Sequence, residues 1–225
     1  MLGFYDYTVV LTYMSLVSAV LGITMTSTGH PIIATFCLLF CGLCDMFDGK
    51  VARTKKNRTD EEKSFGIQID SLTDVVAFGV LPAVIVLSLC DYRWYACIVS
   101  AMYVLAGMIR LAYFNVTEEL RQKTTDECRK NYSGLPITSA ALIFPVVYCV
   151  ISAYCVWHSR IEHFGELFLT SPFRISLCVL TAVVGLCFLL PFKIRKPQSK
   201  ELWMLFAIGA FVAAVLFAFW LGNIF

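Results

Sequence analysis

The sequence predicts an all-α integral membrane protein, and its composition and apolar runs lead to that fold class. Of the 225 residues, 59% are hydrophobic and 15% are charged, whereas an average soluble domain has about 45–50% apolar and about 25% charged residues. The apolar residues gather in runs of the length that a helix needs to cross a bilayer, about 20 residues. These runs lack the strict alternation of outer-membrane barrel strands, so helices are expected.

Seven apolar runs are expected to form transmembrane helices. In chain order they are 8–28, 31–53, 66–90, 94–116, 135–157, 172–191 and 201–222. Only short polar loops separate them, so residues 1–225 are expected to form a single polytopic membrane domain. No Lys or Arg precedes the first run, which argues against a cleaved signal peptide.

Two of these boundaries carry a local signal. Thr59 and Glu62 have the spacing of a capping box, so part of the loop before the third run can begin its helix. Pro136 is expected in the first turn of the fifth helix, where its missing N–H costs nothing.

Basic residues gather in alternate loops and predict the topology. One side carries Lys50, Arg53, Lys55, Lys56, Arg58, Lys63, Arg121, Lys123, Arg129, Lys130, Lys193, Arg195, Lys196 and Lys200. The other side carries Arg93, Arg160 and Arg174. The expected location is a bacterial-type cytoplasmic membrane. By the positive-inside rule, the basic loops and the N-terminus are expected on its cytoplasmic side, and the C-terminus on the outer side.

Four aspartates lie inside or at the ends of two neighbouring runs. Asp45 and Asp48 are three residues apart, and Asp70 and Asp74 are four apart, so each pair lies on one helix face. A carboxylate at mid-bilayer costs roughly 2.5–3.5 kcal/mol on insertion scales. The same faces carry the small residues Gly49, Ala52 and Gly66 near their cytoplasmic ends, and the cation Arg53 follows Ala52.

If the two helices are antiparallel neighbours, the four carboxylates form a cage. Two unit charges 4 Å apart repel by about 4 kcal/mol at an effective dielectric constant near 20, so such a cage needs cations. Oxygen-only ligation favours Mg²⁺ or Mn²⁺ over zinc, and paired metals suit the clamping of a phosphoryl group.

Three other interpretations explain the aspartates less well. Loop-end salt bridges with nearby Lys and Arg do not explain the small residues at fixed offsets. A cation transporter predicts acidic residues that reach both sides, whereas these four gather at one end. A non-catalytic scaffold leaves the cost of the aspartates unexplained.

The combined pattern resembles the CDP-alcohol phosphotransferase family, whose hallmark is D-x-x-D-G-x-x-A-R followed by G-x-x-x-D-x-x-x-D. All eight fixed positions are present, as Asp45, Asp48, Gly49, Ala52, Arg53, Gly66, Asp70 and Asp74. The family usually has eight residues between the Arg and the second Gly, and this chain has twelve (54–65), which should lengthen the cytosolic loop. The segments S-L-T-D-V-V-A-F-G-V-L-P-A, R-L-A-Y-F-N-V and S-G-L-P resemble the bacterial phosphatidylserine synthase branch.

This resemblance implies a fold and a reaction. The fold would be a six-helix bundle with a catalytic core over about residues 5–190 and an additional helix at about 201–222. In the implied reaction, the serine hydroxyl attacks the diacylglycerol-bearing phosphate of CDP-diacylglycerol, and CMP leaves. Asp74 would be the general base, all four aspartates would take part in holding two Mg²⁺ or Mn²⁺ ions, and Gly49, Ala52, Arg53 and Gly66 would bind the CDP moiety.

The acceptor alcohol depends on fewer residues. Arg110 lies inside the fourth run and Asn115 near its cytoplasmic end, and a buried Arg is expected to find an anion. We expect Arg110 and Asn115 to hold the acceptor, although Arg110 could instead pair with an aspartate. Glycerol 3-phosphate and an inositol phosphate are the alternative acceptors. Membrane lipids and a second copy of the chain, in a homodimer, are the expected partners, and no nucleic acid is expected.

Overall fold

Long helices make up most of the chain in the computed structural model, which describes residues 3–55, 57–124, 131–157, 171–195 and 199–221. In chain order the helical elements are η1 (Tyr7–Val9), α1 (Val10–Ser27), α2 (Pro31–Ala52), α3 (Asp60–Asp74), η2 (Val75–Val80), α4 (Leu81–Leu89), α5 (Trp94–Thr124), η3 (Ile137–Ser139), α6 (Ala140–Trp157), α8 (Ser171–Leu189) and α9 (Ser199–Leu221). Each of the seven apolar runs contains a helix, and the all-α prediction is confirmed.

Five helical stretches of the described chain are long and apolar enough to cross a membrane. They are Tyr7–Ser27, Pro31–Ala52, Asp60–Leu89, Trp94–Arg121 and Glu201–Leu221. Two further apolar stretches, Ile137–Ala153 and Phe173–Leu189, are shorter. The chain is therefore an integral membrane protein.

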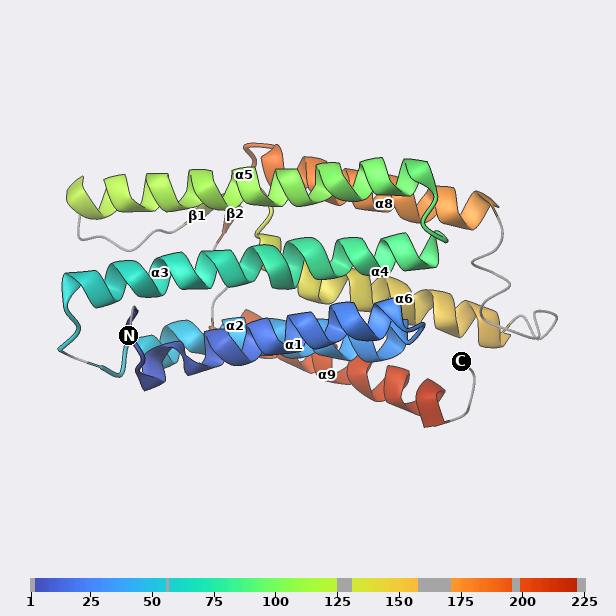
Figure 1. Ribbon diagram of the computed structural model, residues 1–225, viewed down its shortest axis with the longest axis horizontal. Helices are drawn as coiled ribbons and strands as arrows, with labels where there is room; N and C mark the ends of the chain where they lie inside the picture. Colours follow the sequence, from blue (N-terminus) through green and yellow to red (C-terminus); the bar gives the residue numbers. More distant parts are fainter. Residues whose placement is uncertain (1–2, 56, 125–130, 158–170, 196–198, 222–225) are drawn as a thin grey trace.

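The helices pack in a bundle around the rod formed by α3, η2 and α4 (Figure 1). α1 packs against α2 and α4, α5 packs against α8 and α4, and α6 packs against α2 and α9. α2 and α6 approach closely because Gly42 has no side chain: a Cβ there would lie 2.6 Å from the Cβ of Ala141. The core includes the fully buried Leu38, Phe78 and Leu81.

The central rod begins outside its apolar run. A capping box forms between Thr59 and Glu62, with Thr59 Oγ1 accepting from the Glu62 N–H at 3.2 Å and Glu62 Oε2 accepting from the Thr59 N–H at 3.1 Å. The helix therefore begins at Asp60 rather than at residue 66, because polar residues with a good cap extend it beyond the apolar segment.

A π-helical turn, η2, interrupts the rod directly after Asp74. Pro82 has no N–H to donate to the carbonyl oxygen of Phe78, four residues earlier. The hydroxyl of the buried Tyr103 on α5 donates to that oxygen at 2.7 Å instead. A side chain of α5 thus satisfies the backbone group that the proline leaves without its helical donor.

Two three-residue strands lie beside the bundle. β1 (Asn131–Ser133) pairs antiparallel with β2 (Lys193–Arg195). Gly134 follows β1 with a φ of +75°, and its N–H donates to the carbonyl oxygen of Phe192 at 2.8 Å. Pro136 lies just before the 3-10 turn η3 and not in the first turn of α6, which begins at Ala140.

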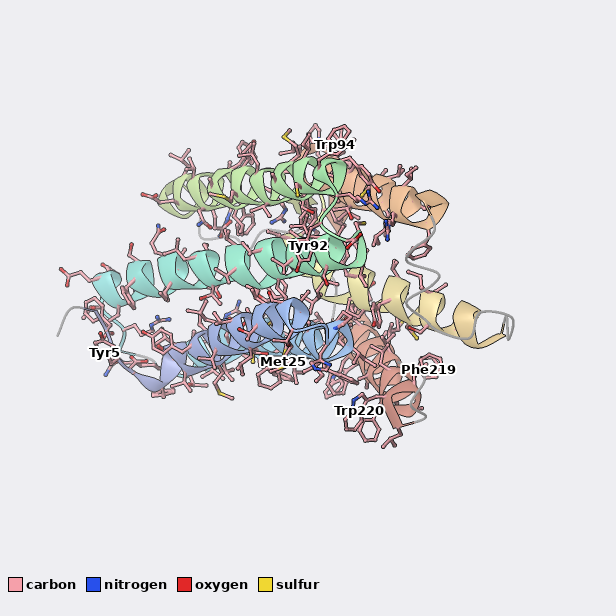
Figure 2. All side chains as sticks on the ribbon, turned by 45° about the vertical axis from the view of Figure 1, so that its right-hand side comes forward. Tyr5, Met25, Tyr92, Trp94, Phe219 and Trp220 are labelled. Carbon is pink, nitrogen blue, oxygen red and sulfur yellow. The ribbon has the colours of Figure 1, made fainter. Side chains whose placement is uncertain are left out.

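The two ends of the bundle differ. The α2–α3 connection and the end of α5 lie at one end, and the α4–α5 turn lies at the other (Figure 1). Exposed aromatic side chains lie toward both, with Tyr5 near the first and Trp94 at the α4–α5 turn (Figure 2). This placement fits an interfacial aromatic belt.

Candidate metal and substrate site

Three carboxylates from two helices meet inside the bundle. Asp45 lies in the C-terminal half of α2, and Asp70 and Asp74 lie in the last turns of α3. One carboxylate oxygen from each of the three lies within 4.8 Å of the other two. The helical spacing of Asp70 and Asp74 puts them on one face, and the packing of the rod brings that face toward Asp45.

Asp48 is not one of the three carboxylates that meet, but it lies next to Asp70. Its side chain lies close enough to Asp70 for a hydrogen bond between the two carboxyl groups. Asp74 is the most enclosed member, with 8% of its surface exposed, while Asp45, Asp48 and Asp70 are half-buried. The cluster therefore has an enclosed inner part at Asp74 and a more open outer part.

Lys50, the lysine nearest in sequence, lies over the Phe47 ring with Nζ 5.1 Å from the ring centre, and two lysines of the α2–α3 region pair with other acids. Lys55 Nζ lies 2.6 Å from Asp6 Oδ2 and 3.0 Å from Glu62 Oε1, and Lys63 Nζ lies 3.0 Å from Asp60 Oδ1. These contacts do not support the interpretation of the four aspartates as loop-end salt bridges with the neighbouring lysines.

Arg110 brings a positive charge to the inner part of the cluster. It lies on α5 with 8% of its surface exposed, and its charge interacts with Asp74. Its guanidinium carbon lies 5.8 Å from the centre of the Phe114 ring. The alternative that Arg110 faces an aspartate therefore agrees with the structure. One guanidinium does not balance four carboxylates, and hard oxygen donors in this number suit Mg²⁺ or Mn²⁺.

The small residues of the two faces have different surroundings. A Cβ added at Gly49 would meet nothing within 4 Å, so open space lies beside this part of α2. A Cβ added at Gly66 would lie 2.6 Å from Nη2 of Arg58, so a guanidinium covers that glycine. Ala52 is half-buried in the last turn of α2, and Arg53 follows it as an exposed C-cap.

Two side chains that the sequence did not single out belong to the surroundings of the site. Ser71 accepts a hydrogen bond from Asn115 Nδ2 at 2.8 Å, which ties α5 to the residue after Asp70. Arg58 lies over Gly66. The basic composition of the 54–65 loop was visible in the sequence, but which of its cations reaches α3 depends on how that loop folds.

Comparison with known proteins identifies relatives over much of the chain. A model of the CDP-alcohol phosphatidyltransferase family matches residues 7–172. A CDP-diacylglycerol–serine O-phosphatidyltransferase of Saccharomyces cerevisiae is 36% identical over 141 residues, which is 61% of this chain and 49% of that protein. An archaetidylserine synthase of Methanothermobacter thermautotrophicus is 36% identical over 139 residues, or 61% and 55% of the two chains.

A third relative is a CDP-diacylglycerol–serine O-phosphatidyltransferase of Helicobacter pylori, which is 35% identical over 142 residues, or 62% and 55% of the two chains. The matched region thus spans about half the length of each of these curated relatives. No solved structure matches the chain.

Proposed function

This chain belongs to the CDP-alcohol phosphatidyltransferase family, and from that premise we propose that it transfers the phosphatidyl group of CDP-diacylglycerol to the hydroxyl of L-serine and releases CMP. The observation that carries the proposal is the meeting of the Asp45, Asp70 and Asp74 carboxylates between two membrane helices. The names of the three relatives support serine as the acceptor.

The aspartates would hold two divalent ions, Mg²⁺ or Mn²⁺. The proposed donors are Asp45, Asp70 and Asp74, whose oxygens meet, and Asp48 beside Asp70, with Asp74 at the inner end. When bound, such ions neutralise phosphate charge and orient the phosphoryl group for displacement. The clustering of the carboxylates fits this use, because without cations their mutual repulsion opposes the fold.

Asp74 is the proposed general base. It accepts the proton of the serine hydroxyl, whose oxygen then bonds to the diacylglycerol-bearing phosphorus. The bond from that phosphorus to the CMP oxygen breaks, and CMP leaves with the electron pair. The enclosed position of Asp74 limits access of water, which would otherwise compete with serine as the nucleophile.

Arg110 is the proposed acceptor-binding residue, and Asn115 is proposed to support it. Arg110 approaches the cluster at Asp74, where a serine whose hydroxyl meets the base would present its carboxylate to the guanidinium. Asn115 lies one and a half turns further along α5 and contacts Ser71. It would therefore act by holding α5 against α3.

The CDP moiety is proposed to bind along Gly49, Ala52, Arg53 and Gly66. The open space beside Gly49 lets the nucleotide approach the backbone of α2, and the exposed Arg53 supplies a cation for phosphate. The basic loops at this end of the bundle favour a site that opens to the cytoplasm, with the lipid tails remaining in a bacterial-type cytoplasmic membrane.

We also propose that the protein is a homodimer, as expected for the family. Light scattering of the purified protein in detergent, corrected for bound detergent, measures the mass of the polypeptide. A mass of one chain at concentrations that support activity would contradict this assignment.

An acceptor panel tests the reaction. The purified protein in detergent receives CDP-diacylglycerol, Mn²⁺ or Mg²⁺, and either serine, glycerol 3-phosphate or an inositol phosphate. We expect metal-dependent CMP release with serine only. Release with another acceptor but not with serine would correct the acceptor, and no release with any of the three would overturn the proposed activity.

A further inference from the structure

The connection between α2 and α3 is held by contacts at both of its ends. Lys55 bridges Asp6, before η1, and Glu62, in the first turn of α3, with distances of 2.6 and 3.0 Å. Thr59 closes the capping box with Glu62. Glu62 thus takes part in both contacts, and the short segment between Lys55 and Thr59 has fixed ends.

Arg58 lies in that segment and reaches back over α3. Its Nη2 donates to the carbonyl oxygen of Glu62 at 3.1 Å, and the same nitrogen lies 2.6 Å from the position that a Cβ on Gly66 would take. Only glycine leaves room for this guanidinium. Arg58, a cation of the twelve-residue loop, therefore lies directly against Gly66, one of the small residues of the site.

The Arg58 guanidinium has N–H groups that are not used in the contact with Glu62. Its Nε is buried and has no hydrogen-bond partner among the residues that the structure describes, and an arginine side chain carries five N–H groups in all. A buried donor without a partner is costly in a folded protein. A ligand with several acceptor oxygens would supply the missing partner.

The position suits a ligand that extends from the aspartate cluster. Gly66 precedes Asp70 by four residues of α3, a rise of about 6 Å along the helix. A diphosphate with one phosphate at the carboxylates has oxygens at this scale of separation. Arginine binds phosphate oxygens through two parallel N–H groups, which a lysine cannot do.

We propose that Arg58 is a substrate-binding residue whose guanidinium donates to the diphosphate oxygens of the CDP moiety. This inference rests on the proposed function, and it adds to it a residue of the loop that follows the hallmark arginine. Lys63 offers a matched comparison, because it is a cation of the same region whose side chain is 56% exposed and whose ammonium group pairs with Asp60.

Nucleotide binding tests the assignment separately from turnover. Calorimetry with CDP and Mn²⁺ on the purified protein in detergent is run for the wild type, Arg58→Gln, Arg58→Lys and Lys63→Gln. We expect CDP affinity to fall roughly 10- to 100-fold in Arg58→Gln, in the range of one charge-assisted hydrogen bond. Arg58→Lys should fall between that variant and the wild type, and Lys63→Gln should match the wild type.

Kinetics distinguish binding from a purely structural role. In Arg58→Gln the KM for CDP-diacylglycerol should rise and the KM for serine should stay unchanged, while thermal unfolding without nucleotide stays close to that of Lys63→Gln. Equal CDP affinity in Arg58→Gln and Lys63→Gln would overturn the assignment, as would equal increases in both KM values.

Three further outcomes are decisive. If Arg58→Gln does not fold, Arg58→Lys decides: at least a several-fold loss of CDP affinity supports the assignment, and unchanged affinity overturns it. A wild type that neither binds CDP nor releases CMP would remove the proposed function and this inference with it. Normal CMP release by the wild type, with unchanged CDP binding in the Arg58 variants, would overturn only the assignment of Arg58.

Discussion

The side-chain amide of Asn115 donates to Ser71 Oγ at 2.8 Å, and this bond joins α5 to the residue that directly follows Asp70. α5 also carries Arg110, whose charge acts on Asp74. The bond therefore fixes α5, which carries the Arg110 cation, relative to α3, which carries the Asp70 and Asp74 carboxylates.

Breaking this bond should slow catalysis without removing it. Asn115→Ala and Ser71→Ala should each lower kcat/KM for serine roughly 2- to 13-fold, which corresponds to one hydrogen bond of about 0.5–1.5 kcal/mol. Because the two residues share the bond, the double variant should be no worse than the poorer single variant. Multiplying losses in this double-mutant cycle would show that the residues act independently.

Removing the proposed base should separate chemistry from binding. Asp74→Asn should lower kcat by at least about 100-fold, because a positioned general base contributes roughly 10²–10⁴-fold, while CDP binding in Mn²⁺ largely persists. Asp60→Asn is the control, since Asp60 is an exposed acid at the start of the same helix. Robust turnover by Asp74→Asn would assign the base to another group.

Charge repulsion among the carboxylates predicts that a substitution at Asp48 affects thermal stability differently without and with metal ions. In EDTA, Asp48→Asn should raise Tm, because it removes a carboxylate that faces Asp70. In Mn²⁺ the same variant should gain less stability than the wild type, because a proposed metal ligand is lost. Thermal unfolding in detergent measures both, and a variant less stable than the wild type in EDTA would argue against repulsion between these carboxylates.

The Tyr103 hydroxyl should stabilise the fold at the π-helical turn. Tyr103→Phe leaves the Phe78 carbonyl without its 2.7 Å donor and should lower the free energy of unfolding by about 1–3 kcal/mol. Tyr113→Phe changes an exposed hydroxyl on the same helix and should have little effect. Equal stability of the two variants by denaturant unfolding would show that the carbonyl finds another donor.

The contact between the N-terminal segment and the α2–α3 loop should depend on pH. The Lys55 ammonium, with the Thr8 N–H, holds the pKa of Asp6 well below its usual range. The folded-state pKa is lower than the unfolded value of about 3.9, so the contact stabilises the fold above that value. Its contribution is lost as the pH falls through the folded-state pKa.

Asp6→Asn should therefore be less stable than the wild type near neutral pH, and the difference should shrink in strong acid. Glu61→Gln, an exposed acid in the first turn of α3, provides the control. Unfolding midpoints measured from pH 7 down to the limit of solubility give the comparison. A difference that stays constant across this range would exclude a role for the charge of Asp6.

Hydropathy predicted where helices exist but not where they end outside the membrane. The third helix begins at Asp60, and its capping box was the only sign of this in the sequence. α5 continues to Thr124, beyond the apolar run, through a polar segment. An ion pair between Arg121 and Glu118, with nitrogen and oxygen 2.6 Å apart, stabilises this extension. Such extensions depend on local caps and ion pairs rather than on burial.

Helical spacing predicted which aspartates share a face, because that depends only on the local period of the helix. The hydrogen bond to the Phe78 carbonyl comes from Tyr103, 25 residues away, and the hydrogen bond to Ser71, next to Asp70, comes from Asn115, 44 residues away. These contacts require the packed structure. Arg58 reaches the Glu62 carbonyl oxygen only once the loop has folded back on α3, so the sequence indicated no more than a basic loop.

α1 begins and α9 ends at opposite ends of the bundle (Figure 1). An affinity tag joined behind α9 would therefore lie far from the carboxylates and from the Arg58 loop. Immobilising the protein on a sensor chip through such a tag would leave the end with the proposed nucleotide site facing the flow, while a tag before η1 would crowd that end.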